Sequence, residues 1–126
     1  MKEAADQNER NPMTPPPPEI PGIRRIDLQR HDLSAPGREV IQNRVDISSE
    51  APATRHFHPG EEVIYVLEGT IEYQIDGEPA QMVGTGEVLA VPAERIHSAK
   101  NVGAGPAAEL ATYIVEKGKP LVTVAD

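Results

Sequence analysis

The chain has 126 residues, of which 12 are basic and 20 are acidic, giving a formal net charge of −8, and it contains no cysteine. Without cysteine there is no disulfide, no thiolate metal site, no iron–sulfur cluster and no cysteine nucleophile. An acidic chain without a basic stripe is a poor candidate for binding nucleic acid or an anionic membrane surface. No apolar run approaches the roughly 20 residues of a membrane-spanning helix. Any bound metal must therefore be held by imidazole and carboxylate groups.

The first 22 residues differ from the rest, because six of the 13 prolines lie there, four of them at positions 15–18. We expect residues 1–22 to form a flexible proline-rich tail and residues 23–126 to form one domain. A proline-rich ligand for a partner domain is the alternative reading of the tail. The start has no apolar segment of the signal-peptide kind, so a soluble cytoplasmic protein is expected.

From residue 23 onward, short apolar runs are broken by Gly, Pro, Asn and Asp at intervals of roughly ten residues, which is typical of an all-β domain. The clearest hairpin covers residues 70–83, with Asp76 and Gly77 supplying a turn that needs positive φ. Residues 88–91 and 109–116 are also predicted strands. A sandwich or barrel is the natural architecture.

The strand predicted at residues 62–67 is apolar on both faces. Alternation places Glu62, Ile64 and Val66 on one face and Val63, Tyr65 and Leu67 on the other. If the first face is the interior, the second needs a cover, and Phe57 is expected to join it. We predict that this outer face packs on a second sheet or, in a homodimer, on a second subunit.

The histidines suggest a metal centre. His56 and His58 are two residues apart, so on a strand both imidazoles project from one face. Glu62 follows after a Pro-Gly turn, and His97 begins another predicted strand. Three neutral imidazoles and one carboxylate suit a divalent first-row metal with open coordination positions. His31 falls outside this pattern and is expected at the surface.

The same residues give the chain a resemblance to single-domain cupins. The first cupin motif is matched at His56, His58, Glu62 and Gly69, with Glu50 where the leading Gly is usual. The second is matched at Gly86, Pro92, His97 and Asn101, with Glu94 where the middle Gly is usual. Because Gly marks unusual backbone conformations, Glu50 and Glu94 predict altered loop geometry near the strand ends.

The resemblance implies an all-β jelly-roll barrel, the double-stranded β-helix of cupins, over residues 23–126. It also implies that His56, His58, Glu62 and His97 hold one divalent transition-metal ion. Fe, Mn, Ni, Co, Cu and Zn all accept such ligands, so the metal's identity stays open. In oxygenase members the matching glutamate doubles as ligand and base, which makes Glu62 the candidate catalytic residue here. Its neighbour Glu61 is expected to be solvated.

Few other groups are expected in the substrate pocket. Thr54 shares the face of His56 and can hydrogen-bond substrate or water. Ile64 and Val66 are expected to form an apolar floor, and Arg44, if it points inward, can anchor an anionic substrate. With Phe57 and Tyr65 directed away from the metal, the pocket should be aliphatic.

The expected function is that of a metal-dependent enzyme acting on a small organic substrate. Resemblance to quercetinase-like cupins places a dioxygenase first. An isomerase, cyclase or lyase using the metal as a Lewis acid is the alternative. A non-catalytic binding or sensor module is the third reading.

Overall fold

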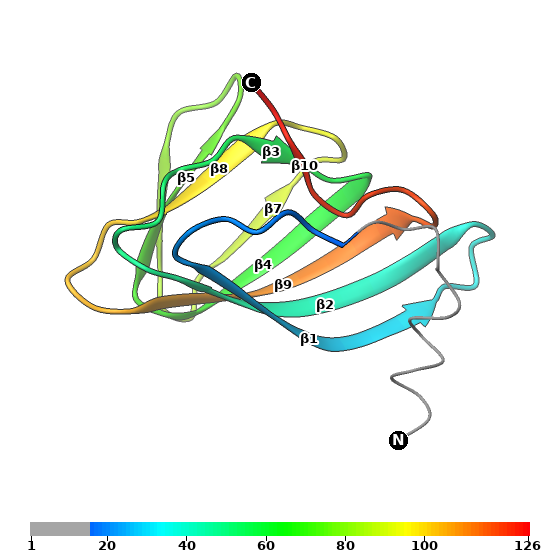
Figure 1. Ribbon diagram of the computed structural model, residues 1–126, viewed down its shortest axis with the longest axis horizontal. Coiled ribbons are helices and arrows are strands. Elements are labelled where there is room, and N and C mark those ends of the chain that lie inside the picture. Colours follow the sequence, from blue (N-terminus) through cyan, green and yellow to red (C-terminus); the bar gives the residue numbers. More distant parts are fainter. Residues whose placement is uncertain (1–15) are drawn as a thin grey trace.

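The computed structural model describes residues 16–126 and consists of two five-stranded antiparallel sheets that face each other (Figure 1). All ten elements of the described residues are strands, and their arrangement in two sheets confirms the predicted all-β jelly-roll fold. Among these residues there is no helix that could cross a membrane. The strands are β1 (Ile23–Asp32), β2 (Arg38–Ile47), β3 (His56–Phe57), β4 (Gly60–Glu68), β5 (Thr70–Ile75), β6 (Gln81–Gly84), β7 (Val88–Val91), β8 (His97–Asn101), β9 (Ala107–Glu116) and β10 (Thr123–Val124).

The first sheet has the strand order β1-β2-β9-β4-β7 and the second β10-β3-β8-β5-β6. The pleat of each strand directs alternate side chains between the sheets, so that every second residue of β2 is buried. The core is mostly aliphatic, but its largest fully buried side chains are those of Tyr73 and Tyr113.

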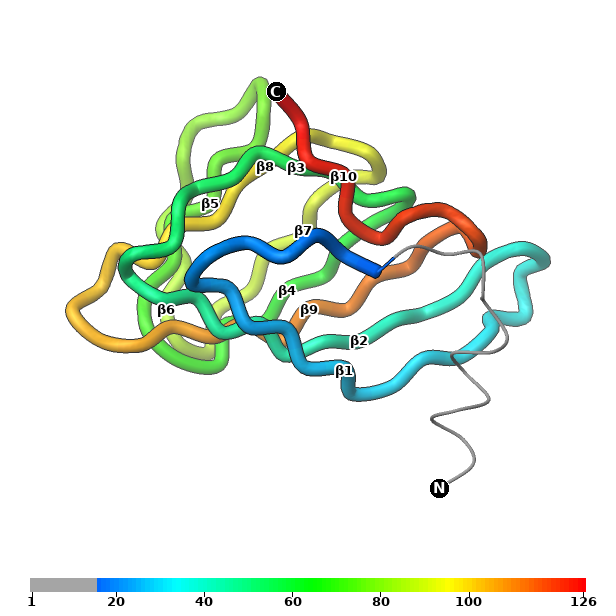
Figure 2. The backbone as a smooth tube through the Cα atoms, viewed as in Figure 1, coloured from blue at the N-terminus to red at the C-terminus, as the bar shows by residue number. Residues whose placement is uncertain are grey.

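The segment before β1 is attached to the domain. Residues 16–22 form no strand, and Figure 2 shows them, in blue, doubling back beside β1. The amide of Ser48 donates to the carbonyl of Gly22 at 2.9 Å, and the amide of Ile23 donates to that of Ile20 at 3.0 Å. Residues 1–15 of the predicted tail lie outside the described residues.

Strand β4 begins at a position where only glycine fits. A Cβ built on Gly60 would lie 1.9 Å from the carbonyl oxygen of Ile114 in the neighbouring strand β9. This close approach lets the chain pass from His58, at the end of the second sheet, to Glu62 in the first. The Pro-Gly turn predicted between the two ligands is therefore a crossing between sheets.

The outer face of β4 is open to solvent, because Val63 and Tyr65 are each 45% exposed. No other part of residues 16–126 covers it, so the reading in which a second sheet of the same chain does so is wrong. Phe57 does not belong to this face, since it lies on β3 in the opposite sheet. The alternation of side chains along the sequence could not show that the chain passes from one sheet to the other between Phe57 and Val63.

The predicted hairpin at residues 70–83 is present as the pair β5–β6. Its turn is closed by the amide of Glu78, which donates to the carbonyl of Ile75 at 2.9 Å, and Gly77 has φ of 87°. Strand pairing resumes only at Tyr73 and Gln81, so the connection is longer than a two-residue turn.

The loop before β8 keeps a glycine-like conformation although its residue is Glu94. The φ of Glu94 is 61°, and no other non-glycine among the described residues has a positive φ. The sequence predicts altered loop geometry at Glu50 and Glu94, and the φ angles do not bear this out. Glu50 has no positive φ, and Glu94 adopts the left-handed conformation that a glycine would favour. The amide of Glu94 donates to the carbonyl of His58 at 3.2 Å, which connects this loop to the other histidine segment.

Replacing Glu94 by glycine should stabilise the protein. A side chain in the left-handed region costs roughly 1–2 kcal/mol, and the greater freedom of unfolded glycine offsets part of the gain. We expect Glu94→Gly to raise the free energy of unfolding by about 0.5–1 kcal/mol in urea denaturation. Glu94→Ala, which keeps the Cβ, is the matched control and should show no such gain. Equal stability of the two variants would contradict a strained backbone at this position.

Candidate metal centre

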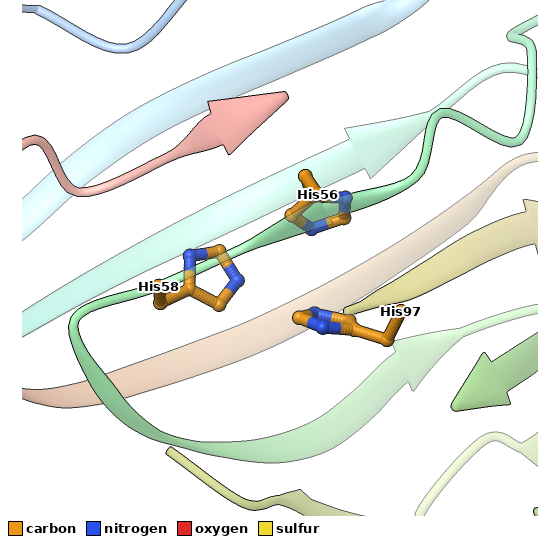
Figure 3. A group of neighbouring side chains, drawn as sticks. All are labelled: His56, His58 and His97. Atoms are coloured by element: carbon orange, nitrogen blue, oxygen red, sulfur yellow. The ribbon is translucent and has the colours of Figure 1, made fainter. Parts of the chain in front are cut away.

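Three of the four histidines converge between the two sheets. His56 and His97 are directly opposite each other in the β3–β8 pair, and His58 follows β3 by one residue. One nitrogen from each ring lies within 4.8 Å of the others. Figure 3 shows the three rings turned toward one point. Cross-strand pairing and the two-residue spacing thus bring together the side chains that the sequence predicts.

Backbone carbonyls orient all three rings in the same way. Each Nδ1 is hydrogen-bonded to a carbonyl oxygen: His56 to Thr54 at 2.8 Å, His58 to Leu121 at 2.8 Å and His97 to Arg95 at 2.9 Å. Because a carbonyl only accepts, each Nδ1 must carry its proton. In the neutral ring each Nε2 then holds a free lone pair, which is the form that binds metal.

Glu62 directs a fourth lone-pair donor at the same point. Its Oε1 lies 3.0 Å from Nε2 of His58 and 3.1 Å from Nε2 of His97, and its side chain is buried. Nε2 of His97 shares a hydrogen bond with this oxygen, whereas Nε2 of His58 is buried and has no hydrogen-bond partner among residues 16–126, despite the short distance. The lone pairs of His58 Nε2 and Glu62 Oε1 repel each other unless a cation lies between them. A metal ion with imidazole and carboxylate ligands fits this arrangement.

Metal binding needs deprotonated ligands, and the pKa shifts of His56 and Glu62 favour that form whereas the shift of His97 does not. Burial, together with the neighbouring His97 and His58, lowers the pKa of His56 to about 4. Burial alone would raise the pKa of Glu62, but His58 and His97 hold it well below its ordinary value. Burial lowers the pKa of His97, and the hydrogen bond to Glu62 more than reverses this, so that it is raised. The cluster therefore contains a carboxylate that needs a positive charge beside it.

The centre opens into a cavity of about 40 Å³. Thr54 lines it, as predicted, together with His56, Glu62 and His97. Ile64 and Val66 point inward and are fully buried, but they belong to the core and not to the cavity wall.

Arg44 does not reach the cavity. Its guanidinium lies 3.1 Å from Asp46 and 3.7 Å from Glu68, on the outer face of the first sheet. The inward alternative for Arg44 is therefore wrong: β2 directs Asn43 and Val45 between the sheets, and Arg44 lies between them in the alternation.

Four polar residues of the wall were not found from the sequence: Arg25, Tyr73, Glu109 and Tyr113. The expectation of an aliphatic pocket is wrong for this reason. A signal existed, because the alternation of the predicted strands at 70–83 and 109–116 places the two tyrosines and Glu109 inward. The arginine comes from β1, for which no strand was predicted individually.

Glu109 is a buried acid close to the metal ligands. The hydroxyl of Tyr73 donates to its Oε1 at 2.5 Å. Burial, and to a lesser degree the negative charge of Glu62, raise the pKa of Glu109 to about 8. At neutral pH Glu109 is therefore mostly protonated, whereas Glu62 is ionised.

Comparison with known proteins identifies both the domain and the fold. A family profile described as "Cupin domain" matches residues 43–115. No curated protein sequence matches the chain significantly.

Three solved structures illustrate the likeness of fold. The polyketide cyclase RemF from Streptomyces resistomycificus has a TM-score of 0.66 at 23% identity, covering 87% of this chain and 75% of its own. Oxalate decarboxylase from Bacillus subtilis has a TM-score of 0.65 at 18% identity, covering 87% and 29%. An oxalate oxidase in complex with the substrate analogue glycolate has a TM-score of 0.64 at 23% identity, covering 81% and 54%. The chain thus spans about half or less of the two oxalate enzymes, and these identities indicate a shared fold only.

Replacing Glu109 by Gln should flatten the dependence of stability on pH. With the pKa raised from 4.5 to about 8, the folded protein binds more protons than the unfolded chain between these values, so stability falls as the pH rises. Glu109→Gln cannot ionise and keeps an acceptor for Tyr73. Relative to the wild type, we expect it to gain roughly 4 kcal/mol between about pH 5 and pH 9 in urea denaturation.

The control for this experiment is Glu61→Gln, which removes one carboxylate from the exposed face of β4. It should follow the wild-type pH dependence. If Glu109→Gln also follows it, Glu109 is ionised in the folded protein at neutral pH.

Proposed function

Since the chain belongs to the cupin family, we propose that it is a metalloenzyme that holds one divalent transition-metal ion and acts on a small organic molecule. The proposed ligands are His56, His58, His97 and Glu62. The observation that carries this proposal is the convergence of three Nε2 lone pairs and one carboxylate oxygen, with all three Nδ1 atoms hydrogen-bonded to carbonyls.

Each protein group at the centre has a defined task in this proposal. When bound, the metal would supply Lewis-acid or dioxygen chemistry. Glu62 contributes one ligand oxygen, and its carboxylate is the candidate base for a substrate proton. Thr54 orients His56 through its carbonyl and presents its side chain to the cavity. Glu109, protonated at neutral pH, is a proton donor held at the cavity wall by Tyr73.

We place dioxygenase chemistry first. The proposed ligands number four, so a bound divalent metal that takes more than four ligands would keep positions for substrate or dioxygen, and the small cavity lies beside them. The likeness to a structure named as an oxalate oxidase supports oxidative chemistry on this fold. Lewis-acid cyclase or lyase chemistry is the second candidate, favoured by the coverage of both chains in the match with the polyketide cyclase.

The two candidates are separated by the metal and by oxygen uptake. Elemental analysis of the protein as isolated should show about one transition-metal ion per chain. Oxygen consumption with enol and diketone substrates should then accompany Fe, Mn, Ni, Co or Cu. Zinc in the isolated protein, with no oxygen uptake, would overturn the dioxygenase proposal and favour the Lewis-acid one.

Loss of a proposed ligand should lower metal affinity. His97→Ala removes one of the four donors, and we expect binding at least about tenfold weaker in a competitive titration with a metal chelator. His31→Ala is the matched control and should bind as the wild type, because His31 lies on β1 outside the histidine cluster and its ring contacts the side chain of Gln29. Unchanged affinity in His97→Ala would refute the ligand assignment.

We also propose that the chain is a homodimer through the outer face of β4 and β7. Val63, Tyr65 and Val88 are 45%, 45% and 67% exposed, and the last two are paired across the strands. Neighbouring exposed apolar side chains at the edge of a sheet are typical of an interface.

Sedimentation velocity at micromolar concentration tests this surface. The wild type should sediment as a dimer, and Tyr65→Asp should shift it to monomer because a charge would be buried without a partner. Met82→Asp is the control, since Met82 is 63% exposed but lies on β6 in the other sheet. A monomeric wild type would exclude the proposed dimer.

A further inference from the structure

Arg25 is a partly buried cation on the wall of the metal cavity, and it has no ion-pair partner among residues 16–126. Burial alone would lower its pKa, but the surrounding groups, Tyr113 first, raise it above its ordinary value. A charge held away from water in this way is costly unless something negative pairs with it. Glu62 and Glu109 line the same cavity and contribute to the raised pKa, but neither forms an ion pair with the guanidinium. The cavity therefore contains a permanent positive charge that no carboxylate of the described residues contacts directly.

The contacts of Arg25 leave several donors unused. Its Nη1 donates to Oδ1 of Asn43 at 3.0 Å and to the hydroxyl oxygen of Tyr113 at 2.9 Å. Asn43 is held in turn by Asp27, whose Oδ1 accepts from its Nδ2 at 3.0 Å. Within the described chain, Nη2 and Nε of Arg25 donate no hydrogen bond. The Tyr113 hydroxyl accepts from Arg25, so its own hydrogen also remains available.

These donors lie close to the proposed metal. The Tyr113 ring packs edge-on against His58, with centroids 4.7 Å apart, and the guanidinium carbon of Arg25 lies 5.9 Å from the same ring centroid. One tyrosine ring thus separates the guanidinium from a metal ligand. Arg25 and Tyr113 line the same cavity as His56 and His97.

The charges in the cavity favour an anion there. The wall carries one permanent cation, Arg25, and two carboxyl groups, those of Glu62 and Glu109. Even with both carboxyl groups ionised, a divalent ion together with Arg25 would leave the cavity with an excess of positive charge. Neither Asn43 nor Tyr113 offsets it.

The space available indicates what kind of anion fits. The cavity of about 40 Å³ has room for a carboxylate group or a few waters, but not for a larger ligand. A groove of about 600 Å³ adjoins it and shares Ile20, Ile23 and Arg25 as walls.

The rest of that groove is formed by residues 17–21 and by β1. Three prolines and two isoleucines make much of it apolar, and its acidic residues, Glu19 and Asp27, outnumber its one cation besides Arg25, which is Arg24. An apolar body therefore suits this groove better than a second carboxylate does.

We propose that Arg25 and Tyr113 form an anion-binding subsite of the metal cavity, and that its ligand is a monocarboxylate with an apolar body. The carboxylate pairs with the guanidinium and the tyrosine hydroxyl, and the body lies in the groove beneath residues 17–21. This inference rests on the proposed metalloenzyme function and adds the substrate class. It also assigns a role to the proline-rich segment, which forms one side of the binding groove.

Calorimetric titration of the full chain, with and without bound zinc, tests the subsite. The probes are benzoate, its neutral analogue benzamide, and the dicarboxylate oxalate. Benzoate should bind the wild type at least about tenfold more tightly than benzamide or oxalate. Arg25→Gln should weaken benzoate binding by about tenfold or more, and Tyr113→Phe by a smaller factor. Arg44→Gln, on the outer face, is the control and should bind benzoate as the wild type.

Each result bears on the subsite separately from the metal centre. Zinc content and urea denaturation are measured for every variant, so that a loss of fold or of metal is seen directly. Tyr113→Phe keeps the ring against His58 and serves if Arg25→Gln does not fold. Benzoate binding that is equal in the wild type and in both variants, or absent from the zinc-loaded wild type, overturns the subsite. If the wild type holds no transition metal as isolated and binds no zinc, the metalloenzyme proposal fails, and the metal-free titration still tests Arg25.

Discussion

The structure depends on one electrostatic constraint: four lone pairs meet in a buried space between two sheets and need a cation. Each imidazole is fixed by a carbonyl behind it, so none can turn away, and Glu62 stays ionised because the rings face it. A single shared proton can offset only part of this repulsion. A divalent ion offsets it at all four atoms, which is why the pattern indicates a metal centre and not a buried polar network.

The fold supplies this convergence from both sheets. His56 and His97 are cross-strand neighbours in the second sheet, whereas Glu62 lies in the first. The chain crosses between them through a glycine packed against the carbonyl of Ile114, a position at which any side chain would force β4 away from its neighbour β9. The loop at Glu94 hydrogen-bonds to the His58 segment in a conformation that favours glycine. The left-handed conformation of Glu94 costs energy, and the loop that contains it leads directly into β8, which begins at His97. The position of His97 therefore depends on this loop.

Local alternation was enough to predict the metal side of the site, because His56, His58 and Glu62 lie within seven residues of one another. It also predicted the inward face of β4. It failed where contacts depend on strand order. Phe57 and Val63 lie in different sheets, and Arg25 meets Tyr113 across two strand pairings, β1–β2 and β2–β9, which no local pattern encodes. The sequence offers Arg44 of β2 as an anion anchor, but the arginine that lines the cavity is Arg25 of the neighbouring strand β1.

Two carboxyl groups in one cavity have different surroundings, and together they limit what the cavity can accept. Glu62 faces two imidazoles and has a lowered pKa, whereas Glu109 faces the Tyr73 hydroxyl and has a raised one. If both are ionised, they balance a divalent ion and leave Arg25 to attract an anion. If Glu109 keeps its proton, the excess of positive charge is larger. In both cases an anionic ligand is the means of neutralising the cavity, and a protonated Glu109 on the same wall can also donate a proton.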